Sequence, residues 1–143
     1  GEGVELAGSA GLDLSGYQLE LHNGGLPEVY DTLALSGVLP DQKSGFGTKW
    51  VPIVLQNGPT DGVALVLIAS NTVVQFLAYE GAFAAKGGAA DGTMATDIGV
   101  AETSDTAVGE SLQLIGTGKT YSSFKWSGPS LASPGQPNSG QIF

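Results

Sequence analysis

Ser111-Leu112-Gln113-Leu114 and Phe124-Lys125-Trp126 stand on either side of Gly116-Thr117-Gly118-Lys119-Thr120. In both outer stretches polar and apolar residues alternate, and this period of two is typical of a half-buried β-strand. The stretch between them is rich in the glycine that tight turns require. We therefore expect a hairpin of two strands, 109–115 and 121–127. Its inward-facing side chains are expected to be Leu112, Leu114, Phe124 and Trp126.

The rest of the chain carries the same kind of strand signal between clusters of turn residues. Further strands are expected at 4–6, 17–22, 29–35, 50–55, 63–69 and 73–79, with turns that include 57–62. Residues 63–69 are apolar throughout, which is typical of a strand buried on both faces. Pro52 predicts an edge position for its strand, because proline cannot donate to a central ladder. The pattern predicts an all-β sandwich with residues 127–143 as an extended tail along it.

Two other features concern the strand 17–22 and the connection 80–97. In the strand, Gln18, Glu20 and His22 share one face, and we expect that face to be exposed with His22 pointing outward. The connection is rich in alanine, glycine and aspartate, and at most one helical turn is expected, around 82–86. A connection of this length is usually a functional loop or a crossover between sheets.

Composition excludes several classes of protein. The 143 residues suit one domain with a sizeable core. The chain has no cysteine, which rules out disulfides and thiolate metal sites. Its net charge of −9, without any cluster of basic residues, disfavours binding of nucleic acid by this segment. The longest apolar run, 63–69, is far shorter than the roughly 20 residues of a membrane-spanning helix.

The sequence lacks the motifs of common catalytic sites, and we expect a protein that is not an enzyme. The glycine-rich turn before Tyr121 imitates the end of a phosphate-binding loop, but Gln113 stands where that motif needs glycine. His22 is the sole histidine, and no Gly-x-Ser-x-Gly turn exposes a serine nucleophile beside it. A carboxylate pair for glycoside hydrolysis is a three-dimensional arrangement that a sequence does not exclude.

Two sets of residues are candidates for binding. Asp91 and Asp97 could supply oxygen ligands to calcium, the one cofactor considered, although a solvated acidic surface is the simpler interpretation. Tyr30, Trp50 and Tyr121 lie near turns or strand ends, where aromatic rings can stack on a sugar. The alternative is that these rings close the ends of the sandwich, because aromatic side chains dominate core burial.

A series of short motifs resembles the lamin tail domain family in its bacterial, secreted branch. The motifs run in order along nearly the whole chain: Glu5-Leu6-Ala7-Gly8, Asp13-Leu14-Ser15-Gly16-Tyr17, Leu35-Ser36-Gly37, Asn57-Gly58-Pro59-Thr60-Asp61-Gly62-Val63-Ala64-Leu65, Val74-Gln75-Phe76-Leu77-Ala78-Tyr79-Glu80-Gly81, Thr96-Asp97-Ile98-Gly99-Val100 and Pro134-Gly135-Gln136-Pro137-Asn138. The resemblance implies an immunoglobulin-like β-sandwich of two antiparallel sheets, in agreement with the strand pattern. It also implies a secreted, extracellular accessory domain without catalytic residues of its own.

What such a domain binds is left open between an unknown protein and a surface glycan. Its relatives are appended to extracellular nucleases or other hydrolases, so a catalytic domain in the same parent chain is an expected partner. Relatives begin with a strand before Glu5-Leu6-Ala7, and this chain starts too late to contain it. We therefore expect residues 1–143 to be a single domain excised from a longer protein. An unpaired strand edge, which allows an edge-strand dimer, is a further expectation.

Overall fold

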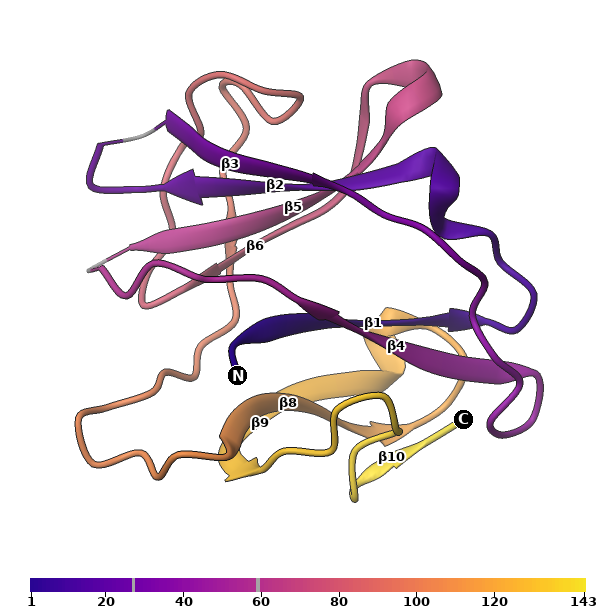
Figure 1. Ribbon diagram of the computed structural model, residues 1–143. Coiled ribbons are helices and arrows are strands. Elements are labelled where there is room, and N and C mark those ends of the chain that lie inside the picture. Colours follow the sequence, from indigo (N-terminus) through magenta and orange to yellow (C-terminus); the bar gives the residue numbers. More distant parts are fainter. Residues whose placement is uncertain (27, 59) are drawn as a thin grey trace. The chain divides into compact units, whose positions relative to one another are not determined.

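The computed structural model describes residues 1–26, 28–58 and 60–143, and these residues form an all-β protein (Figure 1). Pro59, inside the expected turn at 57–62, lies outside the described residues. The strands are β1 (Gly3–Ser9), β2 (Tyr17–Asn23), β3 (Glu28–Ala34), β4 (Phe46–Pro52), β5 (Asp61–Leu67), β6 (Thr72–Tyr79), β7 (Thr96–Asp97), β8 (Glu110–Thr117), β9 (Phe124–Leu131) and β10 (Gln141–Ile142). Single turns of 3-10 helix occur at η1 (Leu14–Gly16), η2 (Ile68–Ser70) and η3 (Tyr121–Ser123). The expected all-β class is confirmed, with the antiparallel sheets of a β-sandwich.

The chain divides into two compact units, each built from segments that are distant in sequence. Unit 1 consists of Gly1–Leu12, Val38–Val54 and Val100–Phe143. Unit 2 consists of Asp13–Gly37 and Leu55–Gly99. Three hydrogen-bonded sheets are present among the described residues, rather than the two expected, and none of them is shared between the units.

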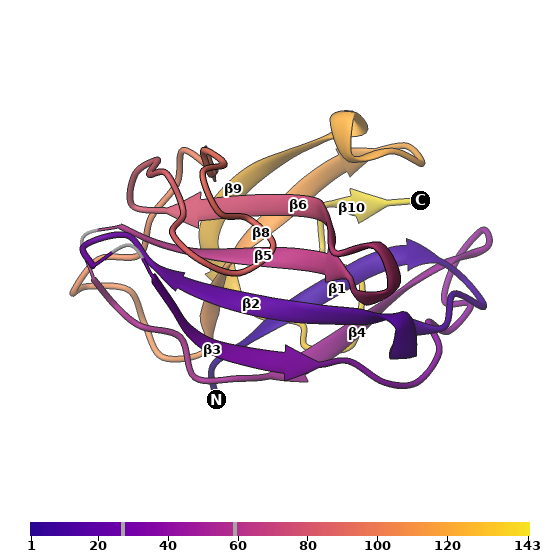
Figure 2. The same ribbon diagram turned by 90° about the horizontal axis from the view of Figure 1, so that it is seen from above.

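Unit 2 contains a five-stranded sheet in the order β3-β2-β5-β6-β7. Figure 2 shows β3, β2, β5 and β6 side by side in this order. Neighbouring strands are antiparallel, except that the short β7 runs parallel to β6. The strands expected at 63–69 and 73–79 correspond to β5 and β6, which pair as a hairpin. The turn between them depends on Asn71, which adopts the left-handed conformation with φ of 50°. At the outer side of the sheet, β3 has β2 as its one strand partner among the described residues.

One face of this sheet is covered by residues 81–95, which we name the covering loop. Its side chains Phe83, Ala85, Ala90 and Ala95 are buried and form one hydrophobic cluster with residues of β5 and β6. No helical turn forms at 82–86, which is within the expectation of at most one. The loop instead folds back on itself, because Ala85 N–H donates to the Thr93 carbonyl and Gly92 N–H to the Ala85 carbonyl. The left-handed φ values of the loop's glycines suit such turns and not a helix.

Unit 1 contains a two-stranded ribbon of β1 and β4 and a three-stranded sheet in the order β10-β8-β9. The strand expected at 50–55 in fact begins at Phe46 and ends at Pro52, because β1 provides partners along that whole length, from Gly3 opposite Pro52 to Ser9 opposite Phe46. Strand β4 has a partner on one side only among the described residues, in agreement with the edge position predicted from Pro52.

Residues 127–131 continue strand β9 and are not part of the tail expected at 127–143. From residue 132 onward the C-terminal tail packs against both sheets of unit 1. Gly135 N–H donates to the Glu5 carboxylate on β1, at 2.7 Å. The last ring, Phe143, stacks on Phe46 of β4 with centroids 5.4 Å apart and meets Phe124 of β9 edge-on at 5.9 Å. In β10 the tail pairs in parallel with the end of β8.

The β8–β9 hairpin is confirmed, but its most buried side chain is one that the alternation did not predict. Phe124 and Trp126 are half-buried and Lys125 between them is exposed, as expected. Leu112 and Leu114 are only half-buried, whereas Gln113 is 5% exposed. A register shift between Ser111 and Gln113 lets the Gln113 amide donate to the carbonyls of Ser130 and Leu131.

Among the described residues, no helix is long and apolar enough to cross a membrane.

Candidate binding groove and the buried pair beneath it

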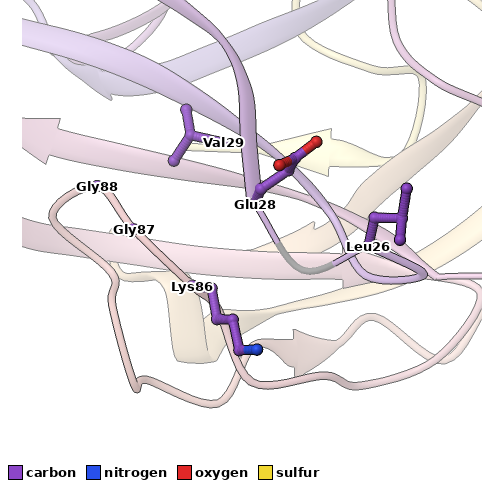
Figure 3. A pocket seen from close by; sticks show the side chains of 6 residues that line it. All are labelled: Leu26, Glu28, Val29, Lys86, Gly87 and Gly88. Atoms are coloured by element: carbon purple, nitrogen blue, oxygen red, sulfur yellow. The ribbon is translucent and has the colours of Figure 1, made fainter.

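Unit 2 contains an open groove between the beginning of β3 and the covering loop. Leu26, Glu28 and Val29 line it from the strand side, and Lys86, Gly87 and Gly88 line it from the loop side (Figure 3). Its volume is about 540 Å³. The groove adjoins the outer edge of the sheet, because Glu28 and Val29 belong to both.

Local hydrogen bonds fix both walls of the groove. On the strand side, Asn23 Oδ1 accepts from the Leu26 N–H at 2.8 Å, and Gly24 N–H donates to the Thr60 carbonyl at 2.6 Å. On the loop side, Asp91 Oδ1 accepts from the Gly87 N–H at 2.7 Å. Both walls are therefore turns closed by a side-chain carbonyl or carboxylate, which is a common role of Asn and Asp.

Glycine is required at position 88. Its φ is +66°, and an added Cβ would collide with the Glu20 carboxylate and with the Val29 side chain. At the neighbouring Gly87, φ is +74° but the space around a Cβ would be empty. The loop thus approaches β2 and β3 as closely as it does because residue 88 has no side chain.

The groove presents charged and apolar groups that a ligand could contact. Lys86 supplies an ammonium group, Glu28 a carboxylate and Leu26 an exposed apolar side chain. None of the six lining residues carries a hydroxyl, thiol or imidazole. Such a surface suits non-covalent contact with a partner that has both charged and apolar groups.

Beneath the covering loop lies a buried acidic and basic pair, Glu20 and His22 of β2. His22 is 0% exposed and Glu20 is 4% exposed, and His22 Nε2 lies 3.6 Å from Glu20 Oε2. The expectation that His22 points outward is therefore wrong. The alternation along β2 was correct, but the loop covers the polar face, and Leu19 and Leu21 of the opposite face are buried as well.

The two members of this pair differ in how their polar atoms are satisfied. Glu20 Oε2 accepts from the Ala89 N–H of the covering loop at 2.9 Å, and Oε1 accepts from Gln18 Nε2 at 3.0 Å. Neither ring nitrogen of His22 has a hydrogen-bond partner among the described residues. Burial lowers the pKa of His22, while the neighbouring Glu20 carboxylate acts in the opposite direction without overcoming it. His22 is consequently neutral at pH 7.

Tyr30, one of the predicted stacking residues, holds the chain before β5. Its hydroxyl accepts from the Gln56 N–H at 3.1 Å, and the Tyr79 hydroxyl donates to the Gln56 carbonyl at 3.0 Å. Burial raises the pKa of both tyrosines. Tyr30 is half-buried, and it belongs to unit 2, whereas Trp50 and Tyr121 belong to unit 1.

The other two predicted rings differ in exposure. Trp50 is half-buried in β4, and its indole lies so close to Gly3 of the paired strand that any side chain at that position would collide with it. Tyr121 is 47% exposed, and its hydroxyl accepts from Trp126 Nε1 at 2.9 Å. Tyr121 is therefore the most accessible of the three rings.

The two predicted calcium ligands each cap a turn of their own. Asp91 binds the Gly87 N–H as described above, and Asp97 Oδ1 accepts from the Gly99 N–H at 2.9 Å. Both aspartates are exposed. Among the residues that the structure describes, no three histidine or carboxylate side chains come together as a metal site would require. The spacing Asp-x-Gly around Asp97 was a signal for such a turn.

Comparison of the chain with protein-family models, curated proteins and solved structures found no match. The resemblance to lamin tail domains consequently rests on the motifs quoted above and stays a prediction.

Proposed function

We propose that this chain is a non-catalytic interaction domain of a secreted bacterial protein, which helps to attach or position an enzyme of the same parent chain. The motif resemblance to bacterial lamin tail domains supports the secreted, accessory role. The acidic composition agrees with a partner other than nucleic acid, because phosphate contacts need basic residues. The groove beside β3 is the surface that we assign to the partner.

The burial of His22 is the observation that carries this proposal. Histidine is the one side chain whose ordinary pKa allows proton exchange near neutral pH, and His22 is the sole histidine of the chain. A general base must reach the proton that it abstracts, but the side chain of His22 is 0% exposed. The groove beside β3 offers charged and apolar surface for binding instead.

Hydrolase assays on the isolated domain test the proposal directly. The purified chain should show no turnover above a buffer blank with nucleic acid, phosphate ester, carboxylic ester and glycoside substrates. Turnover that persists through a second purification and disappears with a single substitution would overturn the non-catalytic role. Sequencing the native reading frame on both sides tests the accessory role. A signal peptide with a hydrolase domain supports it, and a cytosolic reading frame without either contradicts it.

A second candidate function, carbohydrate binding, is favoured by Tyr121. The ring is 47% exposed, and the bond from Trp126 Nε1 holds its hydroxyl in place. An ordered, exposed ring is what stacking on a sugar requires. Affinity electrophoresis through gels that contain soluble polysaccharides should show retardation that Tyr121→Ala removes and Tyr121→Phe retains. Equal mobility of all three proteins in every gel would remove this candidate.

A further inference from the structure

We propose that the covering loop is an acid-operated lid, which opens when His22 takes up a proton and uncovers the polar face of β2. Acid opening goes beyond the interaction role, because it concerns the conditions under which the polar face of β2, with Glu20 and His22, becomes accessible. Lys86, Gly87 and Gly88 belong both to the covering loop and to the groove. Opening therefore also dismantles one wall of the groove.

The first argument is that the covering loop lies over the residues that surround His22. The His22 ring lies 4.9 Å from the Phe76 ring, and Phe83 of the loop meets the same Phe76 ring edge-on at 5.5 Å. Gly62 is the residue opposite His22 on β5, and an added Cβ there would lie 3.1 Å from the Phe83 ring. Phe83 therefore lies over the strand position next to His22. The neighbouring Glu20 is bound by the loop itself, through the Ala89 N–H.

The second argument is that, among the described residues, Glu20 is the one group near His22 that could compensate a positive charge on the ring in the closed state. Its partners across β3 and β5 are Val29 and Gly62, and its ring contact on β6 is Phe76. Both ring nitrogens lack hydrogen-bond partners in the described part of the chain. A buried, unpaired polar atom is costly, and a buried cation is more so.

The remaining ionisable groups of the surrounding elements are engaged elsewhere or exposed. Asp61 on β5 accepts from the Gly58 N–H, and Tyr30 on β3 and Tyr79 on β6 are hydrogen-bonded to the backbone of Gln56. The others are exposed: Glu28 and Asp31 on β3, and Lys86 and Asp91 on the covering loop. Among the described residues, the pKa of His22 responds to the burial of the ring and to Glu20.

The third argument is thermodynamic linkage between protonation and opening. In the closed state burial lowers the pKa of His22, whereas in an open state the ring is hydrated and has its ordinary pKa of about 6.5. The open state therefore binds the proton more tightly, and falling pH favours opening. In the window between about pH 6.5 and the closed-state pKa, each pH unit should raise the open fraction by up to about tenfold.

The chain is built so that the covering loop can move as a segment. It begins after Glu80, which has φ of 71°, at Gly81, which has φ of 122°. Apart from Phe83, the side chains that it buries in the core cluster are alanines. A segment with few large buried side chains opens at a smaller free-energy cost than the strands beneath it.

Amide hydrogen exchange followed by NMR between pH 7.5 and 4.5 tests the proposal in the intact chain. After correction for intrinsic exchange, protection of the Ala89 amide should fall by up to about tenfold per pH unit below about pH 6.5. Amides of the β2–β5 ladder should keep their protection over the same range. The single histidine gives one set of ring signals, so its titration can be followed in the same samples.

Two variants separate the histidine from its neighbour. His22→Phe, or His22→Leu if the first does not fold, should make Ala89 protection independent of pH in this range. Glu20→Gln should keep the response, because His22 still titrates. The proposal is overturned if His22→Phe responds to pH as the unmodified chain does. It is equally overturned if Ala89 and the ladder lose protection together, which would mean global unfolding, or if the ring titrates while Ala89 stays protected.

Discussion

The Glu20 carboxylate on β2 accepts a hydrogen bond of 2.9 Å from the backbone N–H of Ala89, a residue 69 positions later in the chain. Glu20 is 4% exposed, so the bond lies out of water. A charged acceptor makes a hydrogen bond of this kind stronger than a neutral one. The bond ties the covering loop to the sheet, and Gly88 beside it sets how close the two can come.

Gly88→Ala should therefore destabilise the protein more than Gly87→Ala. Both glycines have left-handed φ, which costs an alanine about 1–2 kcal/mol. Only at position 88 would the new Cβ collide with Glu20 and Val29, and such overpacking costs about 1–3 kcal/mol more. Urea denaturation of both variants measures the difference in the free energy of unfolding. Equal losses of unfolding free energy in the two variants would show that residue 88 is not in close contact with Glu20.

Glu5→Gln should leave unit 1 intact and raise stability at neutral pH. Burial raises the pKa of Glu5, against the opposing hydrogen bonds from Gly135 and Thr48. A carboxyl whose folded pKa is raised holds its proton more tightly in the folded state, so its contribution to stability falls as pH rises above about 4.5. Glutamine keeps an oxygen for the Gly135 N–H without the charge. Urea midpoints at pH 4, 5.5 and 7 should show a smaller decline with pH for the variant, and parallel curves would contradict this assignment.

Alkali should destabilise unit 2 through Tyr30 and Tyr79. Burial raises the pKa of both phenols, so above about pH 10 the unfolded chain loses these protons while the folded chain retains them. Stability consequently falls as pH rises beyond that value. Tyr79→Phe removes the bond to the Gln56 carbonyl at a cost of about 1 kcal/mol at pH 7. It should also make the alkaline decline shallower, which thermal melts between pH 8 and 11 can measure.

Chelation should leave the melting temperature unchanged. Asp91 and Asp97 each accept a backbone N–H of their own turn, and the described residues offer no cluster of three potential ligands around them. Calcium at 100 times its dissociation constant would add about 2.7 kcal/mol to the free energy of unfolding. A rise in the melting temperature with calcium that EDTA reverses, and that Asp91→Asn abolishes, would restore the calcium-stabilised module as an interpretation.

Much of the fold could be predicted because its signals are local. The turn at Asn71 and the apolar run that forms β5 and η2 are each specified by residues that are adjacent in sequence. The hairpin of β8 and β9 follows from the alternation of polar and apolar residues on both sides of a glycine-rich turn. Such signals depend on the pleat of a strand and on the φ values that a turn needs. They identify strands and turns without knowledge of what packs on them.

The candidate site was missed because it depends on contacts between distant segments. The sequence around His22 alternates as an exposed face would, and only the covering loop, more than 50 residues later, turns that face into an interior. Likewise Phe46 is in a strand because β1 pairs with it. The small buried side chains of residues 81–95 were the available signal, since alanine and glycine allow a loop to lie close to a sheet.

The division of the chain into interleaved units has a consequence for anyone who wishes to dissect the protein. Residues 13–99 contain the whole of unit 2, but they also carry β4, whose partner β1 would be left behind. In a fragment cut at those positions, the edge of β4 that pairs with β1 in the intact chain would be unpaired. Unpaired strand edges tend to pair with other chains. We therefore expect terminal truncation to cause aggregation, and an internal excision of 38–54, closed by a designed linker, to avoid this bare edge.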